Sequence, residues 1–148
     1  MRRLLPPHLF MLLAFAMLPL CYVFEGPHWL SYPVNLIGIP LLIGGLAIAA
    51  WHKRLFARQH TNVQTFGQPD KLIQSGLYRY SRNPMYLGML VSLSGAALLC
   101  FSSPIAWVLV GIFFMALQYW YVPFEEKQMV IRFQQQYQAY CRQTRRWF

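Results

Sequence analysis

The chain of 148 residues is poor in charge, and above all in acidic charge. Only 11% of its residues are Asp, Glu, Lys or Arg, whereas an average soluble domain has about 25%. A disordered chain is rich in charge and poor in apolar residues, so a composition that is 57% hydrophobic excludes disorder. The three cysteines, Cys21, Cys100 and Cys141, include no close pair in sequence, which excludes a small disulfide scaffold or a zinc ribbon.

Histidines in metal-ligand spacing are also missing. We therefore expect no metal site and assign the four histidines to surface or interface positions: His8, His28, His52 and His60.

Four apolar runs without Lys, Arg, Asp or Glu dominate the sequence: 9–24, 34–51, 86–101 and 105–124. A membrane-spanning helix needs roughly 17–25 mostly apolar residues. Backbone inside a bilayer must satisfy its own hydrogen bonds, which favours helices. The first run is expected to be retained as a helix, because bulky residues stand where a signal-peptide cleavage site needs small ones. We predict one all-α domain over residues 1–148, a polytopic membrane protein with four transmembrane helices.

The 13 basic residues follow a simple pattern. Two precede the first run, six lie between the second and third runs, and five follow the fourth. The positive-inside rule therefore predicts that both termini and the long middle loop are cytoplasmic. The formal charge of +9 is then a topology signal and an attraction to membrane lipids, so nucleic-acid binding is not expected.

The tail after the fourth run predicts an amphipathic helix, because its apolar residues recur every three or four positions. Such a helix can simply lie on the membrane surface. Glu125 and Glu126 favour a further role for this helix, since carboxylates at membrane depth are costly and need a partner or a function. Their partners are expected from elsewhere in the chain, namely Arg79, Arg82 or a ligand. A purely structural ion pair between tail and loop is the alternative.

The end of the middle loop, from Leu72 to Gly88, concentrates three tyrosines and two arginines within residues 78–86. Ser75-Gly76 predicts a turn, and Asn83-Pro84 predicts the start of the third helix. Aromatic faces hold flat rings or cations, and arginines suit carboxylates. Side chains facing lipid headgroups would explain the same residues.

The segment 76–88 reads Gly-Leu-Tyr-Arg-Tyr-Ser-Arg-Asn-Pro-Met-Tyr-Leu-Gly. It resembles the signature of the isoprenylcysteine carboxyl methyltransferase and phospholipid methyltransferase superfamily, which runs Gly-x-Tyr, then Arg-His-Pro-x-Tyr, then Gly. The tail is similar to the second motif of that superfamily through Glu125-Glu126, Tyr137-x-x-Tyr140 and Arg146-Trp147. Both motifs stand in the family's order around a helical hairpin, as in its bacterial integral membrane enzymes.

The resemblance implies a methyltransferase of the bacterial inner membrane that uses S-adenosylmethionine and releases S-adenosylhomocysteine. The methyl acceptor would be a lipid or another hydrophobic small molecule. The resemblance places the cofactor site in the cytoplasmic segments 60–88 and 125–148. It implies a cofactor pocket lined by Lys71, Leu72, Ile73, Gly76, Tyr78, Asn83, Pro84, Met85 and Tyr86.

The candidate catalytic residues are Glu125, Glu126, Arg79 and Arg82. The arginines are expected to hold a carboxylate, and the glutamates to bind a cation or take a proton.

The chain departs from the family pattern at two positions. Asn83 replaces the usual histidine, and an amide does not titrate, so we expect no acid–base role there. Tyr121 stands where the prenylcysteine enzymes have a substrate-binding arginine. Methyl transfer is therefore implied more firmly than a prenylcysteine carboxylate acceptor.

Two other functions remain open at this stage. NADPH-dependent membrane reductases of the sterol and steroid type carry a similar stretch, but an acid usually follows its last glycine, where this chain has Met89. A non-enzymatic membrane scaffold or small transporter would need neither motif.

Overall fold

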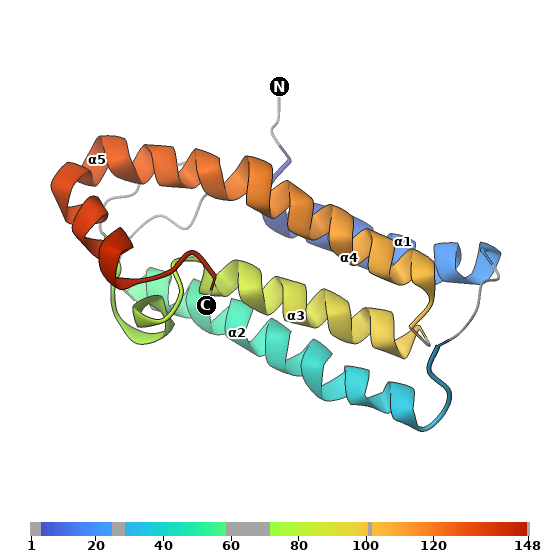
Figure 1. Cartoon of the computed structure of the whole chain (residues 1–148). Helices are drawn as coiled ribbons and strands as arrows, with labels where there is room; N and C mark the ends of the chain where they lie inside the picture. Colours follow the sequence, from blue (N-terminus) through green and yellow to red (C-terminus); the bar gives the residue numbers. More distant parts are fainter. Residues whose placement is uncertain (1–3, 25–28, 59–71, 101, 148) are drawn as a thin grey trace.

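The computed structural model describes residues 4–24, 29–58, 72–100 and 102–147. Within these ranges every regular element is a helix, which confirms the all-α prediction (Figure 1). The order along the chain is α1 (Pro6–Val23), a 3₁₀ turn (Val34–Ile37) leading into α2 (Gly38–Arg58), a 3₁₀ turn (Gly76–Arg79), α3 (Pro84–Leu99), α4 (Pro104–Ala116), a π-helical turn (Leu117–Tyr121) and α5 (Val122–Gln143).

Three helices in the described part of the chain are long and apolar enough to cross a membrane: Pro6–Val23, Val34–His52 and Pro104–Gln143. α3 is apolar but has only 16 residues, a length of about 24 Å. The hydrocarbon core of a bilayer is about 30 Å thick. The chain is therefore a membrane protein with three long apolar helices, and the count of four spans stays a prediction.

The helix that contains the last expected span continues past residue 124. α4 passes through the π-helical turn into α5, and the three form one long rod (Figure 1). Pro123 lacks an N–H and cannot make a regular helical hydrogen bond, and the π-helical turn ends two residues before it, at Tyr121. The sharp change of direction comes further on, at Gln134, whose φ is 42°. The tail is helical as expected, but it continues the fourth apolar run rather than forming a separate helix.

α2 and α3 lie side by side along their lengths and touch through glycines (Figure 1). A Cβ on Gly45 would come within 2.5 Å of the Ser92 backbone nitrogen and would also meet the Gly88 carbonyl oxygen. A Cβ on Gly88 would lie 2.8 Å from the Gly45 carbonyl oxygen. Such close backbone approach is typical of small residues in membrane helices. Gly88, the last glycine of the signature, is therefore required for helix packing.

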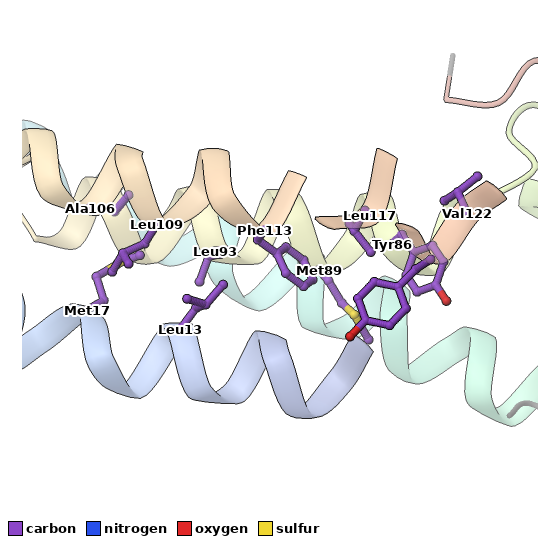
Figure 2. Packing of buried hydrophobic residues seen from close by; sticks show 12 residues of the cluster. Leu13, Met17, Tyr86, Met89, Leu93, Ala106, Leu109, Phe113, Leu117 and Val122 are labelled. Atoms are coloured by element: carbon purple, nitrogen blue, oxygen red, sulfur yellow. The ribbon is translucent and has the colours of Figure 1, made fainter. Parts of the chain in front are cut away.

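A buried apolar row joins α1, α3 and α4 (Figure 2). Its members are Leu13 and Met17 from α1, Met89, Leu93 and Ala97 from α3, and Ala106, Leu109, Phe113 and Leu117 from the rod. Tyr86 and Val122 lie at one end of this row in Figure 2. The apolar packing therefore ends where the signature residues begin.

Adjacent glycines in α2 provide a matched test of this packing. Gly45→Ala forces a methyl group against the α3 backbone, and overpacking of this kind costs about 1–3 kcal/mol. Gly44→Ala meets nothing within 4 Å, and alanine is the better helix former. We expect thermal unfolding in detergent to show a Tm lowered by several degrees for Gly45→Ala and an unchanged or slightly raised Tm for Gly44→Ala. Equal melting of the two variants would contradict the close contact.

Candidate active site

The start of the signature folds as the sequence predicts. Gly76 has φ +64°, and a Cβ there would lie 2.7 Å from the Trp51 indole, so only glycine fits the turn. A 3₁₀ turn follows, and Asn83 stands at the N-cap position of α3, whose first residue is Pro84. Proline suits this position because its fixed φ matches the helix and its missing N–H would have had no helical partner.

The two adjacent glutamates of α5 take different partners. Glu126 lies between two guanidinium groups. Its Oε1 is 2.9 Å from Arg82 Nη2, and its Oε2 is 2.5 Å from Arg146 Nη2. Arg146 Nε also donates to Oε1 at 3.2 Å. The side chains of Arg82 and Glu126 are only 14% and 19% exposed, so water screens this pair weakly. The pair joins the middle loop to the tail.

Glu125 instead faces α3. The Tyr86 hydroxyl donates to Glu125 Oε1 at 2.5 Å, and the Tyr86 side chain is buried. Burial raises the pKa of the nearby Tyr78 phenol far above its usual value, and the charge of Glu125 and the phenol of Tyr140 raise it further. Tyr78 therefore stays neutral beside the carboxylate. Together these side chains place one carboxylate among aromatic rings.

The end of α5 and Thr144, which follows it, are hydrogen-bonded to the 3₁₀ turn of the signature. The Tyr140 hydroxyl donates to the Tyr78 carbonyl oxygen at 2.7 Å, and the Thr144 hydroxyl donates to the Arg79 carbonyl oxygen at 3.4 Å. Burial, opposed by the Arg82 charge, raises the pKa of Tyr140 to about 12, so this donor remains protonated at neutral pH. The turn at Gln134 makes the contact possible, because it brings the end of α5 back toward α3 (Figure 1).

The residues after α5 run beside the start of α3. The Arg82 amide donates to the Arg145 carbonyl oxygen at 3.0 Å, next to a parallel bridge between Ser81 and Arg145. The Arg146 carbonyl oxygen accepts from Asn83 Nδ2 at 3.1 Å and from Ser81 Oγ at 3.3 Å. The Asn83 amide group thus orders the tail, in keeping with its lack of a titratable group.

The structure brings six of the expected residues together: Tyr78, Arg82, Asn83, Tyr86, Glu125 and Glu126. The other expected residues contact this group less directly or not at all. Ile73 is buried, Leu72 and Met85 are half-buried, and Met85 packs against the apolar core. The Arg79 side chain is exposed, and only its carbonyl oxygen joins the tail contact. Lys71 lies outside the described residues.

The assignment of His52 to the surface or interface is wrong. His52 is fully buried at the end of the second apolar run, with its ring centroid 4.9 Å from that of Tyr78. Its Nδ1 lies 3.2 Å from the Ile48 carbonyl oxygen. A histidine next to Trp51 carries no sequence signal for this burial, because the packing partner comes from a turn more than twenty residues away. Among the described residues, no group of three His, Cys, Asp or Glu side chains could hold a metal ion.

The family comparison agrees with this geometry. Residues 34–136 match the family described as phospholipid methyltransferase. No significant match is found among curated proteins or among solved structures.

The match covers well over half of the chain, so the chain belongs to the phospholipid methyltransferase family. It is thereby a methyltransferase of a family that acts on lipid-type substrates and generally uses S-adenosylmethionine. The comparisons do not support the reductase or the scaffold. The matched range includes the signature and both glutamates but not Arg146, which completes the ion cluster from outside it.

Neighbouring arginines in the tail test the ion cluster. Arg146→Ala removes a guanidinium from Glu126, and a hydrogen bond to a charged group contributes about 1.5–3 kcal/mol. Arg145 contacts the signature through its backbone and has an exposed side chain, so Arg145→Ala should leave stability nearly unchanged. We expect a Tm several degrees lower for Arg146→Ala only.

Glu126→Gln provides the second arm of this test. It leaves two guanidinium groups facing each other without their carboxylate, so it should destabilise the protein more than Arg146→Ala does. In the Glu126→Gln background, Arg146→Ala should cost little, because its partner is already gone. Additive losses in the double variant would contradict a shared cluster.

Proposed function

We propose that the protein transfers a methyl group from S-adenosylmethionine to a lipid-type acceptor held in the membrane. The observation that carries this proposal is the hydrogen bond between Tyr86 and Glu125, which joins the two family motifs at one place. Residues of the signature and the acidic pair, far apart in sequence, surround it. Glu126 forms the ion cluster with Arg82 and Arg146, whereas Glu125 contacts the signature through Tyr86.

The residues present fit the donor molecule. Its sulfonium and ammonium groups are cations, which suit the Glu125 carboxylate and the aromatic faces of Tyr78 and Tyr86. Its carboxylate suits the first turn of α3, because the amino-terminal end of a helix favours anions. The buried Arg82 Nε also has no hydrogen-bond partner among the described residues and is a further donor at this end of α3.

When bound, S-adenosylmethionine supplies an activated methyl group. The protein's part is then alignment and exclusion of water, which can lower the barrier by several kcal/mol. Glu125 is the candidate to hold a cationic group or to accept the proton of an amine or thiol acceptor. Arg82, Glu126 and Arg146 position the loop and tail that carry these groups, and the exposed Arg79 is the remaining candidate for an acceptor carboxylate.

The charge pattern supports a topology with the site and both termini on the cytoplasmic side. The resemblance to bacterial integral membrane enzymes implies the bacterial inner membrane. A water-soluble donor then reaches the site from the cytoplasm. An amphiphilic acceptor reaches it from the bilayer. This arrangement requires four crossings, with the short α3 as the third.

Calorimetric titration of the purified protein with S-adenosylmethionine tests the proposal. We expect binding by the wild type, and Glu125→Gln and Tyr86→Phe should each weaken it about 10-fold or more, because each removes a hydrogen bond to a charged group. Tyr119→Phe is the matched control, since Tyr119 is 71% exposed on the rod and should bind normally.

Absence of binding at millimolar cofactor would refute the proposal, and so would unchanged affinity in both site variants. Titration with NADPH is the companion measurement. Binding of NADPH without binding of S-adenosylmethionine would identify a reductase instead.

Incubation of membranes containing the protein with methyl-labelled S-adenosylmethionine identifies the acceptor. After separation of lipids, proteins and volatile products, we expect the label in the lipid fraction. Membranes with Glu125→Gln protein should lose most of that signal. Label confined to protein would contradict a lipid-type acceptor.

A further inference from the structure

Trp147 contacts the rod formed by α4, the π-helical turn and α5, although α5 ends at Gln143. Its indole Nε1 donates to Gln118 Oε1 at 2.7 Å, and its ring centroid lies 5.7 Å from that of Phe114. The Trp147 side chain is half-buried and packs against the apolar core. The tail is therefore held to a part of the rod that lies 29 residues earlier in the chain.

The acceptor of this hydrogen bond is an unusual residue for its place. Gln118 is the single amide in the fourth apolar run, residues 105–124, and it belongs to the π-helical turn. A polar side chain in a membrane-spanning segment is costly unless it has a partner. Trp147 supplies a partner, so the hydrogen bond joins the tail to the irregular part of the rod.

Residues 145–147 form a bridge between α3 and the rod. Backbone carbonyl groups of the bridge accept hydrogen bonds from the segment that leads into α3. Two side chains of the bridge bind the rod, Arg146 at Glu126 and Trp147 at Gln118. The bridge therefore holds the start of α3 and the rod at a fixed distance from each other.

We propose that Trp147 is a positioning residue, which through Gln118 holds the rod where Glu125 meets the Tyr86 hydroxyl of α3. Along the chain, Glu125 lies between the two residues of the rod that the bridge binds. A hydrogen bond is lost when its two atoms separate by about 1 Å beyond their normal distance. A small shift of the rod against α3 would therefore break the contact between Tyr86 and Glu125.

α4 offers a matched control for this role. Trp107 donates its indole N–H to Ser102 Oγ at 2.6 Å, and its side chain is also half-buried and packed against the apolar core. It lies near the start of α4, at the end of the rod away from Glu125. A Trp→Phe change removes one indole hydrogen bond at either position, so the two variants differ in their place relative to the candidate site.

Thermal unfolding in detergent tests the positioning role without any cofactor. Trp147→Phe and Trp107→Phe should each lower the Tm by about 2–5 °C, because each loses a neutral hydrogen bond. Tyr86→Phe should also lower the Tm of the wild type. In the Trp147→Phe background this second loss should be less than half as large, because the contact with Glu125 is already weakened.

In the Trp107→Phe background, Tyr86→Phe should lower the Tm by the full amount, since distant changes add. Equal losses from Tyr86→Phe in the wild type and in both tryptophan variants would overturn the proposal.

Calorimetric titration with S-adenosylmethionine tests the consequence for the site, which rests on the methyl-transfer function proposed above. Trp147→Phe and Gln118→Leu should each weaken binding about 5-fold, which is less than the effect of Tyr86→Phe. The double variant should bind no more weakly than either single variant, because both remove the same hydrogen bond. Trp107→Phe should bind as the wild type does, although its Tm is lowered.

Wild-type affinity in both Trp147→Phe and Gln118→Leu would overturn the positioning role. An equal loss of affinity in Trp107→Phe would also overturn it, because general destabilisation would then explain all the variants. Absence of binding by the wild type would refute the methyl-transfer proposal instead, and the Tm comparison would still decide whether Trp147 positions Glu125 against Tyr86.

Discussion

Glu125 and Glu126 are neighbouring carboxylates that directly follow the apolar part of the rod. The site depends on how these two charges are accommodated. Each carboxylate needs a partner in a region with little water. Glu126 obtains two arginines, one from the loop and one from the tail. Glu125 accepts a hydrogen bond from the Tyr86 hydroxyl of α3. The structural explanation of the acidic pair therefore applies to Glu126, and the chemical role proposed for the pair falls to Glu125.

The tail contributes geometry more than chemistry. Its backbone carbonyl groups accept from the loop and from the cap of α3, so residues 144–146 order the signature without presenting reactive groups. Asn83 illustrates the effect. In place of the family's histidine, its side-chain amide donates to the tail, so the position serves the fold of the site in this chain.

Features that depend on neighbouring residues, such as helix starts and turns, could be predicted from local patterns in the sequence. Apolar runs located the starts of the four apolar helices to within a few residues but not the ends of α2 and of the rod. Ser75-Gly76 formed a turn, and Asn83-Pro84 began α3. Paired motifs also predicted that the loop and tail would meet. The sequence did not indicate which glutamate takes which partner, because that depends on the direction of the chain after Gln134. Nor did it show the burial of His52, since this depends on packing between distant elements.

The π-helical turn at Leu117–Tyr121 has a consequence for the orientation of the acidic pair. Leu109 and Phe113 face the buried core. In an uninterrupted α-helix with about 3.6 residues per turn, Phe124 would lie on the same face. The π-helical turn adds one residue, so Glu125 lies on this face in place of Phe124. A carboxylate thus occupies the angular position that an aromatic ring would otherwise hold, and Tyr86 is there to receive it. The direction in which Glu125 points is set by an irregular turn within the long apolar rod. No periodicity count along the chain would reveal this turn.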